Sequence, residues 1–458
     1  KYCPVSNLSF TSNALEKVVM HQLIQLMFHV HLHRLLSEFQ SAYCPYNSSK
    51  IVLVRIVNDR ISAMDNGKVS ILTLLDLSAA FDTIDHDILL HRLQHVFGIQ
   101  GTALSWFKSY LTDRQQIVSV NGRQSKSFQL LYGVPQGSVL GPILFIMYTQ
   151  PLTHVIKRHS LHHQLYADDT QLYKSCCPSE IQSTIKDIED CATDIKSWMK
   201  CNKLQMNDDK TEAMLISSNR LSKFHPMPCS IQINDNSIQF SQHLRNLGIL
   251  IDSSLSFHQQ VNNICRAAYL ELRRISMIRG YLSVDATKTL VCSLVLSRLD
   301  YCNAVLCGLP QCLLYKLQKV QNTAARMIFK APRTDHITPI LHKLHWLPVC
   351  DRIVYKISTL CHTSLTGLSP HYLSDIITLY APSRGLCSSS DTRLLSIHRP
   401  ITKSYGQRTF AYQVPHVWNK LPFELRHKST TSAFKSSLKT HIFHKNESDS
   451  TNTLYVFE

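Results

Sequence analysis

The stretch QLYADDTQLY (Gln164 to Tyr173) decides how this chain folds. Strand-forming residues stand on both sides of Ala167-Asp168-Asp169, a pattern typical of two strands joined by a tight turn. The sequence therefore predicts a β-hairpin with its tip at these three residues. Adjacent carboxylates at such a tip form either a solvated turn or a site where a cation relieves their repulsion.

A second decisive stretch is VSILTLLDL (Val69 to Leu77), which is continuously apolar except at its end. Its length and its β-forming residues predict a buried central strand. Asp76 closes that run. A carboxylate there is costly unless it binds a cation or lies at an exposed strand end.

Around these two stretches, helical and strand patterns mix irregularly. Asn13 and Glu16 resemble a capping pair at the start of a first helix. Helices are predicted at 14–39, 48–64, 87–97, 102–112, 138–156 and 178–200, a strand at 212–216, a hairpin around 234–236, and almost continuous helix over 257–329. This order indicates an α+β fold with an antiparallel sheet core.

Charge and composition narrow the class of partner. The 458 residues include 48 Lys and Arg against 32 Asp and Glu, a formal charge of +16, which favours a polyanion such as nucleic acid. The apolar run PILFIMY (142–148) is far shorter than the roughly 20 residues that span a bilayer, so we expect no membrane partner. The 15 cysteines show no C-x-x-C pair, which favours reduced thiols inside the cell over a disulfide or zinc framework.

Five blocks in this order resemble the palm of reverse transcriptases. They are LLDLSAAFDTIDH (74–86), GVPQGSVLGPILF (133–145), QLYADDTQLY (164–173), NKLQMNDDKTEAML (202–215) and LRNLGILIDSSLSF (244–257). Their wording is most similar to non-LTR (LINE-type) retrotransposons of the Jockey-related kind. The resemblance is strong over 13–257 and weaker to about residue 443.

The resemblance implies a right-hand polymerase. Residues 1–256 would form the fingers and palm, 257–331 a helical thumb-like region, and 332–458 a C-terminal region of unknown role. The implied activity is RNA-directed DNA synthesis, which adds dNTPs to the 3′ end of a DNA primer on an RNA template. The family's endonuclease domain is absent from these residues, so we expect a C-terminal fragment. We expect it to act in the nucleus, the cytoplasm or both.

The resemblance also implies a metal site. Asp76 and Asp168 would hold two Mg²⁺ ions, for which Mn²⁺ can substitute, with Asp169 assisting. Few protein carboxylates are needed because magnesium also takes oxygens from the substrate phosphates. Lys210 would protonate the departing pyrophosphate, although a surface lysine without a catalytic role is an equally good interpretation.

Four further residues would bind the nucleotide and the primer. Phe81 would stack under the deoxyribose and exclude a 2′-hydroxyl, which argues against an RNA-only polymerase; a simple core position is the alternative. Gln136 and Gly137 would support the incoming nucleotide and the template base. Tyr166 would contact the primer end.

Two departures from the family pattern keep a second hypothesis open. Cys3 and Cys44 stand where the family usually has arginine. By the resemblance, the first of these arginines would grip the triphosphate, and the cysteine at position 3 offers no cationic fork for it. The alternative is therefore an inactive retrotransposon relic that at most binds RNA through the basic region 257–330.

Overall fold

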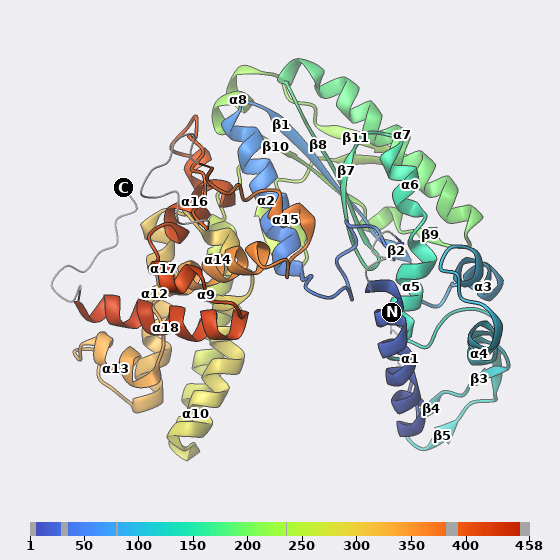
Figure 1. Cartoon of the computed structure of the whole chain (residues 1–458), viewed down its shortest axis with the longest axis horizontal. Coiled ribbons are helices and arrows are strands. Elements are labelled where there is room, and N and C mark those ends of the chain that lie inside the picture. The colour runs from blue at the N-terminus through green and yellow to red at the C-terminus, as the bar shows by residue number, and fades with distance from the viewer. Residues whose placement is uncertain (1–5, 29–34, 79–80, 235, 382–392, 449–458) are drawn as a thin grey trace. The chain divides into compact units, whose positions relative to one another are not determined.

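The computed structural model describes residues 6–28, 35–78, 81–234, 236–381 and 393–448 (Figure 1). The chain divides into two units, each built from separate stretches of sequence. Unit 1 comprises Lys1–Pro45, Ile71–Leu215 and Met227–Ser241, and unit 2 comprises Tyr46–Ser70, Ile216–Pro226 and Gln242–Glu458.

A four-stranded sheet with the order β10-β1-β8-β7 forms the centre of unit 1. β1 (Val69–Leu75) is buried almost throughout, as its continuous apolar run predicted. β7 (His162–Tyr166) and β8 (Asp169–Cys176) are antiparallel, with Tyr166 opposite Asp169. The predicted hairpin is thus confirmed, and Ala167 and Asp168 form its turn. β10 (Glu212–Ile216) matches the strand predicted at 212–216.

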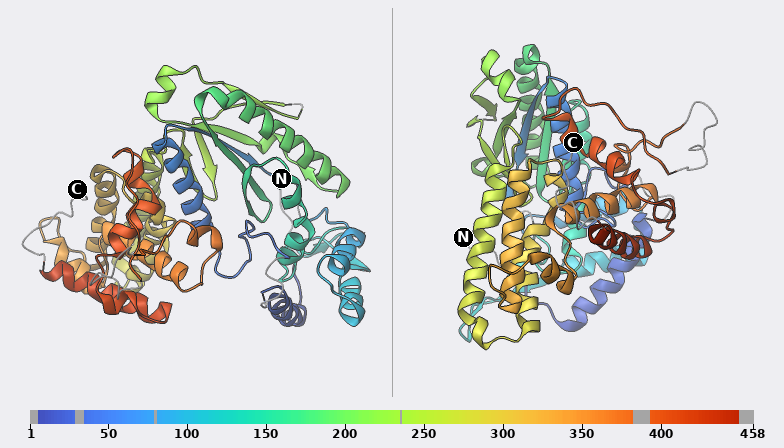
Figure 2. Two further views of the ribbon diagram at one scale, coloured as in Figure 1. Left: turned by 45° about the horizontal axis from the view of Figure 1, so that its top comes forward. Right: turned by 90° about the vertical axis from the view of Figure 1, so that its left-hand side faces the viewer.

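One face of this sheet is covered by α7 (Ile181–Cys201), which packs against β8 (Figures 1 and 2). Its buried residues recur at intervals of three or four, so the helix turns one apolar face inward. The remaining elements of unit 1 are α1 (Phe10–Phe28), β2 (Leu77–Ser78), α3 (His86–His95), α4 (Gly101–Leu111), β3 (Arg114–Gln116), β4 (Ser119–Val120), β5 (Arg123–Gln124), β6 (Phe128–Leu130), α5 (Gly141–Thr149), α6 (Leu152–Lys157), η1 (Pro178–Glu180), β9 (Gln205–Met206), η2 (Asp208–Lys210), β11 (Ser230–Ile233) and β12 (Asn236–Gln239).

Two predicted helices differ from the observed ones. The single helix predicted over 138–156 is two helices, α5 and α6, because Pro151 has no N–H to continue the first and disfavours helical backbone before it. α1 begins at Phe10, so Asn13 lies inside it and is not its cap. The Oγ of Ser9 accepts from the N–H of Ser12 instead. Residues 35–39, predicted as the end of the same helix, are not helical.

Unit 2 is mostly helical, as predicted for 257–329. α2 (Ser49–Asp65) begins with the N-cap Ser48, and α9 (His258–Ile278) packs against α12 (Gln311–Phe329). Its other elements are α8 (Asn219–Phe224), β13 (His243–Asn246), β14 (Ile249–Asp252), η3 (Arg279–Tyr281), α10 (Val284–Val291), the π-helix η4 (Cys292–Leu296), α11 (Ser297–Asp300), η5 (Asn303–Leu306), α13 (Ile337–Leu344), α14 (Val349–Leu365), α15 (His371–Ser374), η7 (Gly406–Arg408), α16 (Phe410–Trp418), α17 (Phe423–Arg426) and α18 (Thr431–Ser448).

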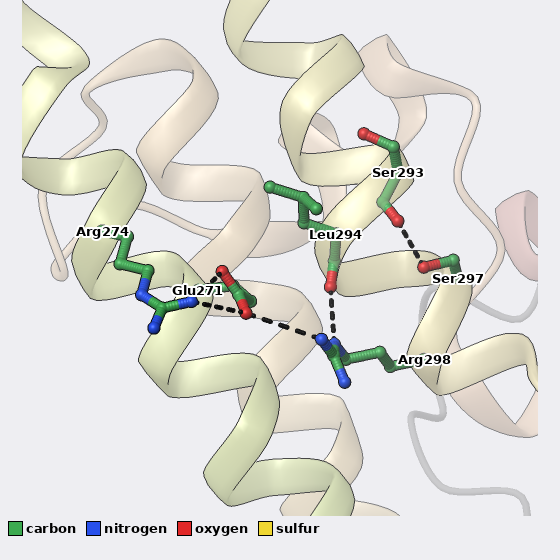
Figure 3. A network of polar contacts seen from close by, with 6 residues as sticks. All are labelled: Glu271, Arg274, Ser293, Leu294, Ser297 and Arg298. Carbon is green, nitrogen blue, oxygen red and sulfur yellow. Dashed lines mark hydrogen bonds and ion pairs between the residues drawn. The ribbon is translucent and has the colours of Figure 1, made fainter. Parts of the chain in front are cut away.

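A small polar network joins α9 to α11 (Figure 3). The Glu271 carboxylate lies 3.2 Å from a guanidinium nitrogen of Arg274 and 3.5 Å from one of Arg298. The Arg298 Nε also donates to the carbonyl of Leu294, one turn earlier. Arg274, one of the basic residues of this region, thus pairs with a carboxylate of its own helix.

Within the described ranges, no helix combines the length and the apolar character that crossing a bilayer requires.

Candidate active site

Asp76 lies directly after β1 and is held by two residues of the segment that contains β9 and η2. The N–H of Asn207 donates to the Asp76 carbonyl at 2.9 Å, and the Lys210 Nζ donates to Oδ2 of Asp76 at 2.8 Å. The Asn207 side chain also points to Oδ2, at 3.5 Å. The Asp76 carboxylate is therefore fixed where the buried strand ends.

The hairpin brings the other two carboxylates to the same sheet edge. Ala167 adopts a left-handed backbone with φ +56°, which reverses the chain so that Asp168 follows in the turn and Asp169 begins β8. Because β1 and β8 are neighbours in the sheet, Asp76 is within electrostatic range of both. The structure thus brings together the three aspartates that the motifs singled out.

These carboxylates repel one another. Burial, then the charge of Asp168 and that of Asp76, raises the pKa of Asp169 to about 6. Burial and the charge of Asp76 also raise the pKa of Asp168. Such a like-charge cluster favours either proton uptake or a bound cation.

A divalent cation fits this donor set. Lys210 is exposed over 68% of its side chain, and its ammonium contacts the Asp76 oxygen that a cation would take. That hydrogen bond and the charge of Asp76 raise the pKa of Lys210. In the described part of the chain, no group of three or more His, Cys, Asp or Glu forms a ready-made metal cage. Magnesium does not need one, because substrate phosphates complete its coordination.

The segment with Gln136 and Gly137 is locked to the segment that follows β2. The N–H of Gly133 donates to the carbonyl of Ile84 at 2.8 Å, and the N–H of Val134 donates to the carbonyl of Phe81 at 2.9 Å. Gly133 has φ +84°, and a Cβ there would lie 2.9 Å from the carbonyl oxygen of Asp82. Only glycine fits this approach.

The predicted nucleotide-binding residues lie on this locked pair of segments. Gly137 also has a left-handed backbone, with φ +95°, and Gln136 is half-buried. Phe81 is half-buried too, and its ring packs against Phe145 with 5.2 Å between centroids. It is therefore neither a fully buried core residue nor a free surface side chain.

Tyr166 ends β7 and has an aromatic neighbour that the sequence did not single out. Burial, then the charges of Tyr166 and Asp168, raises the pKa of Tyr43, so its hydroxyl lies near both. The next residue, Cys44, is partly buried, and burial raises the pKa of its thiol to about 12. Cys44 is therefore a neutral thiol. Cys3, the other departure, lies outside the described residues.

Three more residues that sequence reasoning missed support the site. The Glu16 carboxylate on α1, only 1% exposed, accepts the N–H groups of Val139 and Leu140 at 2.7 and 3.1 Å. His86 contacts the Gly133 carbonyl at 2.8 Å. The Gln40 amide oxygen accepts the N–H of Ala167 at 3.2 Å. Of the three, only His86 stands inside a recognisable motif.

The family model for "Reverse transcriptase (RNA-dependent DNA polymerase)" matches residues 1–251. Two similar curated proteins come from Drosophila melanogaster. A probable RNA-directed DNA polymerase from transposon BS is 28% identical over 63% of this chain and 31% of its own length. The RNA-directed DNA polymerase from mobile element jockey is 26% identical over 72% and 36%. The chain thus spans about a third of the length of these relatives.

Similar solved structures include two telomerases. Apo telomerase from Candida tropicalis is 13% identical with a TM-score of 0.40, over 75% of this chain and 53% of that one. Telomerase from Candida albicans is 13% identical with a TM-score of 0.35, over 77% and 58%.

The family model covers more than half of the chain. Members of this family generally use divalent metal ions. The matched relatives are polymerases of non-LTR mobile elements. The chain therefore belongs to the reverse transcriptase family, in the LINE-type, Jockey-related group that its motifs predicted.

Proposed function

We propose that this chain is the polymerase part of a non-LTR retrotransposon reverse transcriptase, which copies RNA into DNA by adding dNTPs to a primer 3′-hydroxyl. One observation carries the proposal: Asp76, Asp168 and Asp169 lie at one end of the sheet, where burial and then their mutual repulsion raise the pKa of Asp168 and of Asp169. Such a cluster suits a pair of divalent cations.

Asp76 and Asp168 would hold these cations, Mg²⁺ or Mn²⁺, with Asp169 assisting. When bound, they lower the pKa of the primer hydroxyl and neutralise the triphosphate. Lys210, which in their absence contacts Asp76, would turn to the leaving pyrophosphate and donate a proton to it. Its exposure leaves the ammonium free to make that movement.

Phe81 would form the floor under the deoxyribose, because the Phe145 ring supports it from one side. Gln136 and Gly137 would contact the nucleotide and the template base from a segment whose position Gly133 fixes. Tyr166 would contact the primer end. RNA template, DNA primer and dNTPs are accordingly the proposed partners, and the nucleus, the cytoplasm or both the proposed place of action.

Primer extension tests this proposal. The chain is incubated with poly(rA), oligo(dT), dTTP and Mg²⁺, beside Asp168→Asn, which keeps the size of the side chain but removes one charge. We expect extension by the wild type and a loss of about a hundredfold or more in the variant, as expected when a charge that holds the metals is lost. Lys203→Met, on the same unit, serves as a surface control. Equal rates of primer extension by the wild type and by Asp168→Asn would contradict the proposal.

Cys44 favours a second candidate, the inactive relic that binds RNA. Its neutral thiol supplies no positive charge at a position where the family pattern has arginine. In the same assay, a relic gives no extension by the wild type above the Asp168→Asn background, while labelled RNA still binds. Extension that requires Asp168 excludes this candidate.

A further inference from the structure

Unit 2 contains a strongly basic cavity that shares no residue with the aspartate site. The cavity has a volume of about 310 Å³ and is lined by four cationic side chains, Lys50, Arg352, Lys356 and Lys439, and by one carboxylate, that of Asp300. Its formal charge is therefore +3 with histidine neutral. This volume lies at the lower end of the range for small-ligand sites.

Packing, and not a run of basic sequence, brings these charges together. Lys50 is the second residue of α2, whereas Arg352 and Lys356 stand one turn apart on α14 and share a face. Lys439 lies on α18. α14 packs against both α18 and η5, and η5 packs against α2, so the side chains converge from three helices.

The single carboxylate does not neutralise the lysines. The Arg352 guanidinium binds both oxygens of Asp300, with its Nε 2.7 Å from Oδ1. The side chains of Lys50 and Lys356 form no hydrogen bond or ion pair with any residue in the described ranges. Burial, then the charges of Lys50 and of Lys435, lowers the pKa of Lys356. An anion in the cavity would relieve this repulsion.

Asn303 supplies a second and independent sign of a ligand. It is only 5% exposed and lines the same cavity, yet its Oδ1 is buried without a hydrogen-bond partner. Leaving a buried polar atom unsatisfied costs about 1–3 kcal/mol, so such atoms in folded proteins call for an explanation. A hydroxyl donor on a ligand would satisfy it.

We propose that this cavity binds the phosphate group of a nucleotide or polynucleotide. Lys356 and Lys50 hold the phosphate oxygens, and Asn303 accepts a hydrogen bond from an adjacent sugar hydroxyl. The site goes beyond the polymerase proposal, since it needs neither the aspartates nor a bound metal ion.

The test measures thermal stabilisation of the full chain by inorganic phosphate, against chloride at equal ionic strength. The variants are Lys356→Met, which removes the charge inside the cavity, and Lys435→Met. Lys435 is exposed on α18 and does not line the cavity, so its variant loses the same charge nearby. We expect phosphate to raise the melting temperature of wild type and Lys435→Met. In Lys356→Met, apparent phosphate affinity should fall about tenfold, the usual effect of losing one charge-assisted hydrogen bond.

The same variants also separate two sources of the phosphate. Stabilisation by AMP supports a free nucleotide or a chain end as the ligand. Stabilisation by a short RNA without terminal phosphates, but not by AMP, supports an internal phosphodiester. Equal losses in Lys356→Met and Lys435→Met would overturn the proposal, because they indicate general attraction to a basic surface. No phosphate effect on the wild type would overturn it as well. Polymerisation is not measured, so failure of the polymerase proposal leaves this result interpretable.

Discussion

Ionising Asp169 costs more free energy in the folded chain than in the unfolded one. Its ordinary pKa of 3.8 rises to about 6 in the folded chain through burial and through repulsion by Asp168 and Asp76. The folded state binds the Asp169 proton more tightly than the unfolded state does. The protonated carboxyl therefore stabilises the fold fully below pH 3.8, and this contribution is lost as the pH rises through about 6. Without a cation, the ionised cluster is thus least favourable at neutral pH.

We therefore expect Mg²⁺ affinity to fall as the pH drops below about 6, because protons and the cation compete for the same oxygens. Metal titrations at about pH 5.5 and about pH 7.5 check this. In EDTA, the melting temperature of Asp169→Asn relative to wild type should rise over the same pH range. A pH-independent difference between the two proteins would contradict the assignment.

Glu16 positions the segment that follows Gln136 and Gly137. Its buried carboxylate accepts two backbone N–H groups just after Gln136 and Gly137. Glu16→Gln removes the charge at nearly constant size, and we expect a loss of about 1–3 kcal/mol in the free energy of unfolding. KM for dNTP should rise as well. Denaturant titration and primer extension measure the two effects, with the exposed Glu38→Gln as control.

The sequence singled out the three aspartates that the structure brings together, but not the residues that hold the neighbouring segments. Asp76 and Asp168 stand in motifs with a fixed order, so they were predicted. The sequence indicated only a helix cap at Glu16. Its actual partners lie more than a hundred residues away, and no local sequence pattern indicates such a contact. The roles assigned to Phe81, Gln136, Tyr166 and Lys210 stay predictions.

Among the elements, the turn at Gly133 joins the segment of Phe81 to that of Gln136, both of which are predicted to bind the nucleotide. Its left-handed backbone disfavours any side chain, and a Cβ would also clash with Asp82. Gly122 offers a matched control, because its φ of +80° is similar but a Cβ there meets nothing within 4 Å. We expect Gly122→Ala to cost about 1 kcal/mol of stability from strain alone. Gly133→Ala should cost more and also reduce primer extension, and equal effects in both would refute this account.

The arginines of the basic region 257–330 have different roles. Arg279 donates to the carbonyls of Met327, Ile328 and Leu282, so it ties the end of α9 to the end of α12. Arg273 is exposed. Periodicity along one helix shows which residues share a face, but not which of them a neighbouring helix engages. The sequence therefore predicted the helices better than the uses of their charges.

These two residues predict opposite outcomes for the same loss of charge. Arg279→Ala should lower the free energy of unfolding by about 1–3 kcal/mol, since three carbonyls lose a donor. Arg273→Ala should leave stability unchanged and reduce the salt dependence of RNA binding by about one phosphate contact. Urea unfolding and filter binding at several salt concentrations distinguish them. An RNA-binding defect confined to Arg279→Ala would count against this division.

For the whole molecule, the sequence predicted the fold class because its strongest patterns belong to the sheet of unit 1. β1, the β7–β8 hairpin and β10 follow from apolar runs bounded by turn residues, whereas their order in the sheet was not predicted. The grouping of segments was not predictable in the same way. Residues 46–70 belong to unit 2, although most of them precede the first strand of the sheet. The predicted boundaries at 256 and 331 stay predictions.

The placement of α2 affects how the protein is made. Its Arg55 donates to the Tyr372 carbonyl, its Asn58 accepts the N–H of Ala411, and Asp65, its last residue, accepts that of Thr402. During translation α2 leaves the ribosome more than three hundred residues before these partners. Its apolar side chains therefore stay exposed until the segments that pack against them have been synthesised. Synthesis of this chain should therefore depend strongly on chaperones that shield an early helix until the last segments emerge.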